Sequence, residues 1–410
     1  MTELRQSTTV PKTSNSSART PLMSDTTPAY HGAQYVLAGR RARGSRGGSA
    51  GRRAAVGSGK FHRGLPQSAP VNAGVFYGPH DLRCEAVERP RPGPDEILID
   101  VAYCGICGSD IHTFHGSGGN VHNRPPGPRV IGHEVSGVVA AIGDQVTSVK
   151  PGDRVTCLPW MTCGKCPYCR RGAVNHCSSK RLLGGGFAEQ VITVEGTAFL
   201  VPDAVPLTRA ALGEPVSCCV WAHDLGQVPN GAVVLVVGAG TMGLIMAYLA
   251  LRGGAATVIV SEPNETRRAL AATIGAIAID PRQEDPIGVA RHHGDGVGAD
   301  VAFEVVGRTQ TIETALGAVR NGGTVVVVGV ADPDARLSLS PYELYRREIT
   351  LRGCLTRRNS FERGMRWLRH EALDSFVTHT FPIERIGEAM QAAIHGAGGK
   401  VLIAPNGAVP

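Results

Sequence analysis

Residues Ala232-Val-Val-Leu-Val-Val237 run directly into Gly238-Ala-Gly240-Thr-Met-Gly243. The first six form a continuous apolar run, which is typical of a parallel strand covered on both faces. The glycine pattern then opens a stretch from Leu244 to Arg252 that predicts a helix. A strand, a G-x-G-x-x-G pattern and a helix in this order form the context in which the pattern binds a dinucleotide.

Each glycine of this loop has a physical reason. We expect Gly238 to permit the tight turn, Gly240 to let backbone amides approach a pyrophosphate, and Gly243 to let helix and strand pack closely. The N-terminus of the helix adds partial positive charge for the phosphates.

An acidic residue follows the next strand, Thr257-Val-Ile-Val-Ser, at Glu262. Its carboxylate can accept hydrogen bonds from both ribose hydroxyls and would repel a 2′-phosphate. The pattern therefore predicts NAD rather than NADP. Arg267, a full turn further on, is a further cofactor-binding candidate, and with Arg268 it weakens this preference only slightly.

Further strands extend the pattern on both sides of this loop. Ala299 to Val306 and Thr324 to Gly329 complete a doubly wound parallel sheet. Short strands with Gly and Pro between them predict a partly barrel-like β domain before it, with a hairpin at its start. We expect those strands at 75–77, 83–87, 96–103, 135–142, 155–158 and 190–194. A helix at 383–395 and a strand at 400–403 are expected to return to that domain.

A metal-binding pattern lies in the β region. The stretch from Cys104 to His112 includes Cys107 and Ser109, and His133 and Glu134 follow downstream. Zinc accepts sulfur, imidazole nitrogen and carboxylate oxygen, and three protein ligands with one open position make a catalytic site. We therefore expect Cys107, His133 and a carboxylate to form such a site.

A second metal pattern contains only thiols. Four cysteines stand at short spacing, and a site closed by four thiolates leaves no coordination position for chemistry. This zinc would therefore be structural, giving two zinc ions per chain. Its predicted ligands are Cys163, Cys166, Cys169 and Cys177.

Composition narrows the remaining classes. The 410 residues carry a net charge of +7, but residues 1–70 hold 11 of the 42 Lys and Arg and only 2 of the 35 Asp and Glu. The rest of the chain is near neutral, which argues against a nucleic-acid-binding body. Eleven cysteines with metal-type spacing indicate a reducing compartment. Residues 1–70 lack apolar periodicity and predict a disordered basic tail, a targeting leader or a polyanion-binding arm.

Taken together, these motifs resemble the zinc-dependent medium-chain dehydrogenases, and within them the sorbitol, butanediol and threonine dehydrogenase group. The resemblance runs from about Val71 to Pro405 and includes Pro151-Gly-Asp-Arg-Val155 and Glu214-Pro215. It implies an α/β fold with a GroES-like, partly barrel-shaped catalytic domain at 71–222 and 366–410. A Rossmann domain at 223–365 would bind NAD.

The resemblance also implies roles for individual residues. Cys107, His133 and Glu134 would bind the catalytic zinc, and Glu214 would bind the metal or its water. Cys104 would be a buried small side chain and no ligand. The same interpretation covers the remaining cysteines, Cys84, Cys157, Cys218, Cys219 and Cys354.

The implied reaction transfers hydride from a secondary alcohol to nicotinamide while zinc stabilises the deprotonated oxygen. Ser109 would pass the proton through the cofactor ribose to His112. Alternatively, Ser109 is a helix N-cap and His112 a surface residue. Asp110 is expected to be a hydrogen-bond acceptor for the loop.

Substrate identity stays open among polyols, cyclitols, diols and amino alcohols. Arg357 and Arg358 depart from the sorbitol enzyme's pattern and would either meet a polar or anionic substrate or face solvent. The alternatives are an L-threonine 3-dehydrogenase-like enzyme, a zinc-free reductase or, from another class, a nucleic-acid-binding zinc protein. We expect a cytoplasmic homo-dimer or homo-tetramer without nucleic-acid or membrane partners. Ala232 to Leu251 lacks charge over a membrane-spanning length, but its glycines favour the dinucleotide loop.

Overall fold

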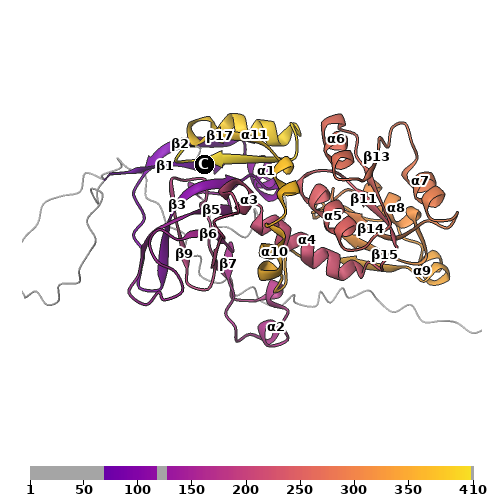
Figure 1. Ribbon diagram of the computed structural model, residues 1–410, viewed down its shortest axis with the longest axis horizontal. Helices are drawn as coiled ribbons and strands as arrows, with labels where there is room; N and C mark the ends of the chain where they lie inside the picture. Colours follow the sequence, from indigo (N-terminus) through magenta and orange to yellow (C-terminus); the bar gives the residue numbers. More distant parts are fainter. Residues whose placement is uncertain (1–68, 118–126, 408–410) are drawn as a thin grey trace, which may run out of the picture.

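The computed structural model describes residues 69–117 and 127–407. The predicted tail at 1–70 therefore lies, except for its last two residues, outside the described part of the chain. Figure 1 shows two bodies side by side, a β-rich body and a body built on a parallel sheet, with a small lobe around α2 projecting from the first.

The β-rich body is organised around one long strand, β3. Its first half pairs with β9 and its second half with β18, while β5 runs along its other edge. This sharing of partners bends the sheet into the partly closed shape expected from the sequence. The seven strands of the sheet are β10 (Ala198–Leu200), β6 (Arg154–Cys157), β5 (Glu134–Ile142), β3 (Glu96–Gly105), β18 (Lys400–Ala404), β17 (Val377–Pro382) and β9 (Gln190–Val194).

Two smaller sheets complete this body. The predicted hairpin is confirmed, since β1 (Val71–Gly78) pairs antiparallel with β2 (Asp81–Val87), and β1 also pairs with β4 (Arg129–Val130). At the base of the projecting lobe, β7 (Trp160–Met161) pairs with β8 (Arg181–Leu182).

The second body is a six-stranded parallel sheet in the order β13-β12-β11-β14-β15-β16. This is the strand order of a doubly wound dinucleotide-binding fold, as the sequence predicts. The strands are β11 (Val233–Val237), β12 (Thr257–Ser261), β13 (Ile277–Ile279), β14 (Ala299–Glu304), β15 (Val319–Val327) and β16 (Thr350–Gly353).

The continuous apolar run of β11 is buried because helices cover both faces of the sheet. Val234 and Val236 pack in one cluster with residues of α4 and α5, whereas Leu235 and Val237 pack in another with residues of α7 and α8. Alternate residues of a strand point to opposite faces, so both faces need apolar side chains.

Helices connect these strands and in several places begin at a polar cap. The α-helices are α1 (Gly108–His115), α2 (Pro167–Arg170), α3 (Leu207–Ala210), α4 (Gly213–Gly226), α5 (Thr241–Arg252), α6 (Glu265–Thr273), α7 (Pro286–His293), α8 (Thr309–Ala318), α9 (Pro341–Arg347), α10 (Phe361–Trp367) and α11 (Ile386–Ile394). The 3-10 helices are η1 (Val174–His176), η2 (Glu371–Phe376) and η3 (Ile383–Arg385).

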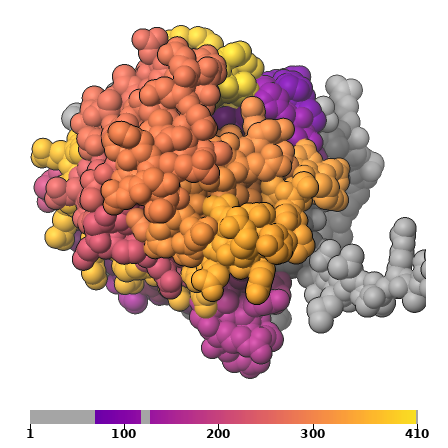
Figure 2. Space-filling model, turned by 90° about the vertical axis from the view of Figure 1, so that its right-hand side faces the viewer, coloured from indigo at the N-terminus to yellow at the C-terminus, as the bar shows by residue number. Residues whose placement is uncertain are grey.

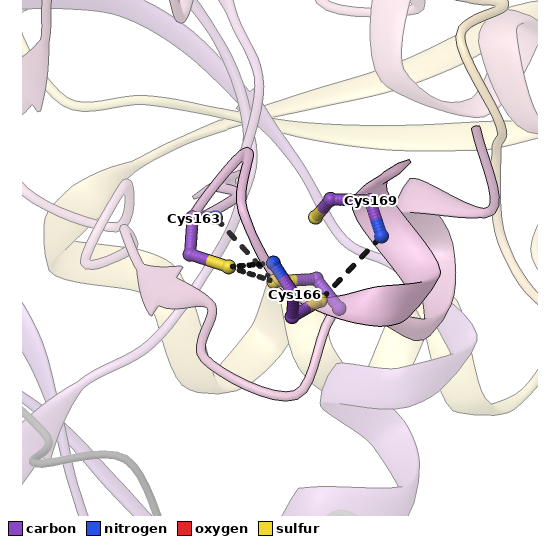
Figure 3. Close-up of side chains that lie close together, drawn as sticks. Cys163, Cys166 and Cys169 are labelled. Carbon is purple, nitrogen blue, oxygen red and sulfur yellow. Dashed lines mark hydrogen bonds between the residues drawn. The ribbon is translucent and has the colours of Figure 1, made fainter. Parts of the chain in front are cut away.

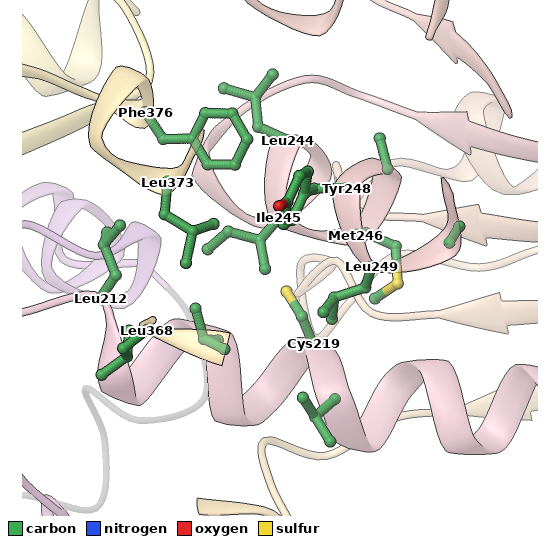
Figure 4. Close-up of a cluster of buried hydrophobic side chains, with 14 of the residues drawn as sticks. Leu212, Cys219, Leu244, Ile245, Met246, Tyr248, Leu249, Leu368, Leu373 and Phe376 are labelled. Atoms are coloured by element: carbon green, nitrogen blue, oxygen red, sulfur yellow. The ribbon is translucent and has the colours of Figure 1, made fainter. Parts of the chain in front are cut away.

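One apolar cluster joins the two bodies. Leu244, Ile245 and Tyr248 of α5 pack against Leu373 and Phe376 of η2, as Figure 4 shows. The same cluster includes Leu212, Leu368 and Cys219 along α4. Because these side chains are close-packed, the glycine loop before α5 is held at a fixed place beside the β-rich body.

The boundary between the two bodies does not coincide with the end of a helix or strand. Helix α4 runs continuously across the proposed boundary at residues 222 and 223, and β18 returns to pair with β3. The uncharged stretch from Ala232 to Leu251 divides into β11, the glycine loop and most of α5. Among the described residues, no helix combines the length and apolar character needed to cross a membrane.

Candidate active site

Three of the predicted metal ligands lie together. Cys107 caps the N-terminus of α1, and Glu134 opens β5 directly after His133. One ligand atom from each lies within 4.8 Å of the others. Gly105 pairs with Glu134 across β3 and β5, and a Cβ at Gly105 would stand 2.0 Å from Oε2 of Glu134. The Gly-x-Cys spacing therefore makes room for the carboxylate.

Asp110 holds two of these ligands in place. Its Oδ2 accepts a hydrogen bond of 3.0 Å from the backbone N–H of Cys107, and its Oδ1 lies 3.5 Å from Nδ1 of His133. Carboxylates commonly orient a metal-binding imidazole in this way. Burial alone would lower the pKa of His133, but Asp110 and then Cys107 hold that pKa well above its ordinary value. This raised pKa favours the protonated ring, and a metal ion that binds the ring has to displace the proton.

Glu134 has a basic partner that the sequence analysis missed. Nζ of Lys400 lies 2.6 and 2.9 Å from the two carboxylate oxygens and donates a third bond of 3.0 Å to the carbonyl of Ile106. Both side chains are buried. The available signal was a lysine inside the otherwise apolar run Lys400-Val-Leu-Ile, where a charged side chain needs a partner.

Glu214 lies near this group but outside it. Burial raises the pKa of Glu134, Lys400 lowers it, and the charge of Glu214 adds to the rise. Oε1 of Glu214 accepts a hydrogen bond of 2.5 Å from Nη1 of Arg357. Arg357 is 3% exposed, so the interpretation that it faces solvent is wrong for this arginine.

Ser109 and His112 both lie on α1, three residues apart and half-buried. The N-cap of this helix is Cys107, so Ser109 is not the N-cap. Nδ1 of His112 lies 3.5 Å from the hydroxyl of Ser117. Their spacing puts the two side chains on one face of the helix, and the proton path through them stays a prediction.

The four predicted thiol ligands also lie together, in the lobe that projects from the molecule. Their sulfur atoms lie within 4.8 Å of one another, and Cys163 and Cys177 are 3.5 Å apart at sulfur. A zinc–sulfur bond of about 2.3 Å separates tetrahedral sulfur atoms by about 3.8 Å, so the donor set fits this ion. Figure 3 shows Cys166 at the start of α2 with its sulfur beside the backbone N–H of Cys169.

Backbone amides favour the thiolate form at two of the four cysteines, whereas burial and the neighbouring thiols raise the pKa of Cys169 to about 12. Hydrogen bonds from the N–H groups of Cys169 and Ser178 lower the pKa of Cys166 to about 5, and similar bonds lower the pKa of Cys163. Thiolates are the form that binds metal.

The other cysteines divide by burial. Cys104 is 0% exposed at the end of β3, and burial raises its pKa well above the ordinary value, as expected of a buried small side chain. Cys157, Cys218 and Cys219 are also buried, while Cys84 and Cys354 are only partly buried.

The dinucleotide loop has the geometry that its glycines predict. Gly238 adopts a φ of 103°, in the left-handed region that favours glycine. A Cβ at Gly243 would stand 2.0 Å from the carbonyl oxygen of Gly238, whereas one at Gly240 would meet open space. The loop thus combines a tight turn and a close helix contact with free space beside Gly240 at the N-terminus of α5. Helix N-termini of this kind favour phosphate groups.

Glu262 fastens this loop. Its Oε2 accepts a hydrogen bond of 2.7 Å from the N–H of Ala239, and its Oε1 one of 2.9 Å from the N–H of Asn264. Each oxygen keeps a second lone pair for a ribose hydroxyl. Arg267 points elsewhere, since its Nε donates to the carbonyl of Gly398 at 2.9 Å.

Two consecutive residues, Gly399 and Lys400, connect the candidate metal ligands to the dinucleotide loop. The hydroxyl of Thr241, the first residue of α5, donates to the carbonyl of Gly399 at 3.1 Å. The next residue, Lys400, holds Glu134. The two candidate sites therefore adjoin each other where the bodies meet (Figure 1).

Family models match both bodies. Residues 93–203 match the alcohol dehydrogenase GroES-like domain, and residues 241–370 match the zinc-binding dehydrogenase model. The chain is 30% identical to a sorbitol dehydrogenase of Bacillus subtilis, over 83% of this chain and 99% of that protein. It is 32% identical to an L-threonine 3-dehydrogenase of Caldanaerobacter subterraneus, over 78% of this chain and 94% of that one.

A solved structure is similar over the same range. It is a putative zinc-binding dehydrogenase from Sinorhizobium meliloti 1021 bound to NADP, with a TM-score of 0.76 and 32% identity, covering 82% of this chain and all of that one. Sequence and fold thus agree with the geometry of the two metal groups and the dinucleotide loop. The chain belongs to the zinc-dependent medium-chain alcohol dehydrogenase family.

Proposed function

We propose that this enzyme oxidises a secondary alcohol to a ketone with NAD, using a zinc ion held by Cys107, His133 and Glu134. The observation that carries this proposal is the direct connection between the two candidate sites, in which Lys400 holds Glu134 and Gly399 holds Thr241. A metal group beside a dinucleotide loop is the arrangement that hydride transfer requires, because alcohol and nicotinamide must meet.

The donor set supports zinc at this position. It offers one sulfur, one imidazole and one carboxylate, and three such ligands leave a position for an alcohol oxygen. Zinc bound there would supply Lewis acidity toward that oxygen. Asp110 would keep the imidazole of His133 oriented, since it lies 3.5 Å from Nδ1.

The residues of α1 would carry the proton away. The hydroxyl of Ser109 can accept one proton while it donates another, and the imidazole of His112 can accept a proton and pass it to solvent. Both side chains are half-buried, which fits a path from the site to the surface.

The end of β12 supports NAD as the cofactor. Glu262 follows β12 with a carboxylate that we expect beside the cofactor ribose. Asp280, at the end of β13, is already paired with Arg268 at 3.3 Å and with Arg282 at 2.5 Å. A 2′-phosphate would therefore meet the negative charge of Glu262, while both of these arginines are held by Asp280.

The substrate would be a polyol, cyclitol, diol or amino alcohol, and the relatives include a sorbitol and an L-threonine dehydrogenase. The L-threonine 3-dehydrogenase-like alternative remains one outcome of the substrate test. Family membership gives both metal motifs a role in a dehydrogenase, so a nucleic-acid-binding function is not proposed.

The experiment is an assay of NADH formation with sorbitol, other polyols, cyclitols, 2,3-butanediol and L-threonine. Parallel reactions use NADP, and a further set uses enzyme stripped of metal by a chelator. The proposal expects turnover on one secondary-alcohol class, a preference for NAD, and recovery when zinc is returned. Full turnover in the stripped enzyme would contradict it.

We further propose that the enzyme works as a cytoplasmic homo-oligomer. Among the described strands, β16 lies at one end of the parallel sheet and pairs only with β15, and the exposed Tyr342 and Tyr345 lie on the neighbouring helix α9. An unpaired strand edge is a site where another chain can pair. Analytical ultracentrifugation would test this, and a monomer at micromolar concentration would contradict it.

A further inference from the structure

Glu214, which the sequence suggests as a metal ligand, forms a buried ion pair with Arg357. Nη1 of Arg357 lies 2.5 Å from Oε1 of Glu214, and the two side chains are 3% and 8% exposed. The thiol of Cys218 donates to the same oxygen at 3.4 Å. Glu214 is close enough to act electrostatically on Glu134, yet its oxygens are not part of the three-residue ligand group.

The number of carboxylate ligands decides whether the metal keeps an open coordination position for a substrate. Cys107, His133 and Glu134 supply three ligands, and Glu214 as a fourth would close a tetrahedral zinc site. A closed site has no position for an alcohol oxygen. The position of Glu214 therefore matters for activity.

Arg357 is fixed from a second side. Its guanidinium carbon lies 3.8 Å from the centre of the Trp160 ring, a cation–π contact with a residue at the base of the lobe. Its other terminal nitrogen, Nη2, is buried and has no hydrogen-bond partner within residues 69–117 and 127–407. The stacking on Trp160 and the ion pair with Glu214 together restrict the orientation of this planar group.

The loop that contains Arg357 is hydrogen-bonded to the four-cysteine lobe. Arg358 donates to the carbonyl of Gly172 at 2.7 Å and to that of Arg171 at 3.3 Å. The side-chain amide of Asn175 donates to the carbonyl of Leu355 at 3.2 Å. The four-cysteine lobe thus supports the residues on both sides of Arg357.

The ion pair between Lys400 and Glu134 differs from the pair between Arg357 and Glu214 in its effect on the metal ligands. Lys400 binds both oxygens of Glu134, but these oxygens stay within reach of Cys107 and His133. Pairing alone does not remove a carboxylate from the ligand group. In contrast, Glu214, the partner of Arg357, lies outside that group, and Arg357 itself stacks on Trp160.

We propose that Arg357 is a positioning residue that holds Glu214 away from the metal and so keeps one coordination position free for the substrate. This inference rests on the proposed function, since it requires a metal at Cys107, His133 and Glu134. It makes Glu214 a partner of Arg357 in the resting enzyme and not a ligand. It also gives the lobe a role in shaping the active site.

The test uses enzyme in which Co²⁺ replaces zinc, because the visible absorption of Co²⁺ reports its ligands. The four-thiolate site has no open position, so only the site at Cys107 can respond to added imidazole. Imidazole is titrated into wild type, Arg357→Met, Arg357→Lys and the double variant Arg357→Met/Glu214→Gln. A matched control is Arg363→Met, which removes an arginine paired with Asp224 at the surface.

Wild type, Arg357→Lys and Arg363→Met are expected to show the spectral change at similar imidazole concentrations. Arg357→Met should need at least about tenfold more imidazole, since Glu214 then competes for the position. The double variant should recover the wild-type response. The same tenfold loss should appear mainly in KM for the alcohol and not in kcat.

A response of Arg357→Met equal to that of wild type would overturn the inference. Should Arg357→Met not fold, Glu214→Gln alone decides, because its Co²⁺ spectrum should match wild type when Glu214 is no ligand. A changed spectrum there would overturn the inference as well. A wild-type enzyme that does not respond to imidazole while Glu214→Gln does would also overturn the inference, because Glu214 would then close the site. A lack of response in both proteins would instead reject the proposed function, so the two failures are distinguishable.

Discussion

The buried pair of Lys400 and Glu134 allows a quantitative test. The change is Lys400→Met, which keeps an apolar stem of similar length but removes the ammonium group. The carboxylate of Glu134, which is 1% exposed, then has no cation beside it. The hydrogen bond of 3.0 Å from Lys400 to the carbonyl of Ile106 is also lost. Breaking one side of a buried ion pair costs about 3–5 kcal/mol of folding free energy.

Zinc should reduce this loss. A dication bound by Glu134 compensates the carboxylate that Lys400 leaves behind, and binding to the folded state alone adds stability. We therefore expect the free energy of unfolding to fall by about 3–5 kcal/mol in the metal-free chain. With saturating zinc the loss should be clearly smaller.

The assay is urea unfolding followed by circular dichroism, with chelator and with zinc. Lys150→Met is the matched control, because Lys150 pairs with Asp153 at 2.8 Å on the surface, and surface pairs contribute little. The double variant Lys400→Met/Glu134→Gln should be more stable than Lys400→Met without metal, since no charge is then stranded. Equal losses of unfolding free energy with and without zinc would refute the claim that Glu134 binds both Lys400 and the metal.

Three further predictions follow from the sites. Cys107→Ser should lower bound zinc from two ions to one per chain and reduce turnover by about a thousandfold or more. The control Cys104→Ala should keep both ions. Elemental analysis measures the zinc content, and the NADH assay measures the turnover. Glu262→Gln should reduce the ratio of kcat/KM for NAD over NADP by about 10- to 100-fold, because one repulsive charge is lost, and an unchanged ratio would exclude this role. In zinc-free protein, iodoacetamide should modify Cys166 above pH 5, since its pKa is about 5, and spare Cys157, with a pKa of about 12; equal labelling of the two by mass spectrometry would contradict this.

The parts of the fold that follow from local pattern were predictable. The strand at Val233–Val237, the turn at Gly238 and the helix after it depend on neighbouring residues, and so does the hairpin of β1 and β2. The short strands β7, β8 and β13 have two or three residues each, too few for a periodic signal. Helix α4 was also missed as an element because it is buried almost throughout and so lacks an apolar stripe.

The site was predictable where spacing carries the information. Cys107, His133 and Glu134 stand out by residue type, and the structure brings them together. The partners of Lys400 and Arg357 could not be predicted, because they lie 266 and 143 residues away in sequence. Whether an arginine lies in solvent or beside a glutamate depends on tertiary contacts, which no local pattern specifies.

The central claim is an open metal site beside a dinucleotide site. A crystal structure of the zinc-loaded enzyme with NAD, recorded with anomalous scattering at the zinc edge, tests it most directly. The account predicts two zinc peaks per chain, one among the four cysteines of the lobe and one bound by Cys107, His133 and Glu134 facing the nicotinamide. A single peak in the lobe, with the nicotinamide remote from Cys107, would contradict it.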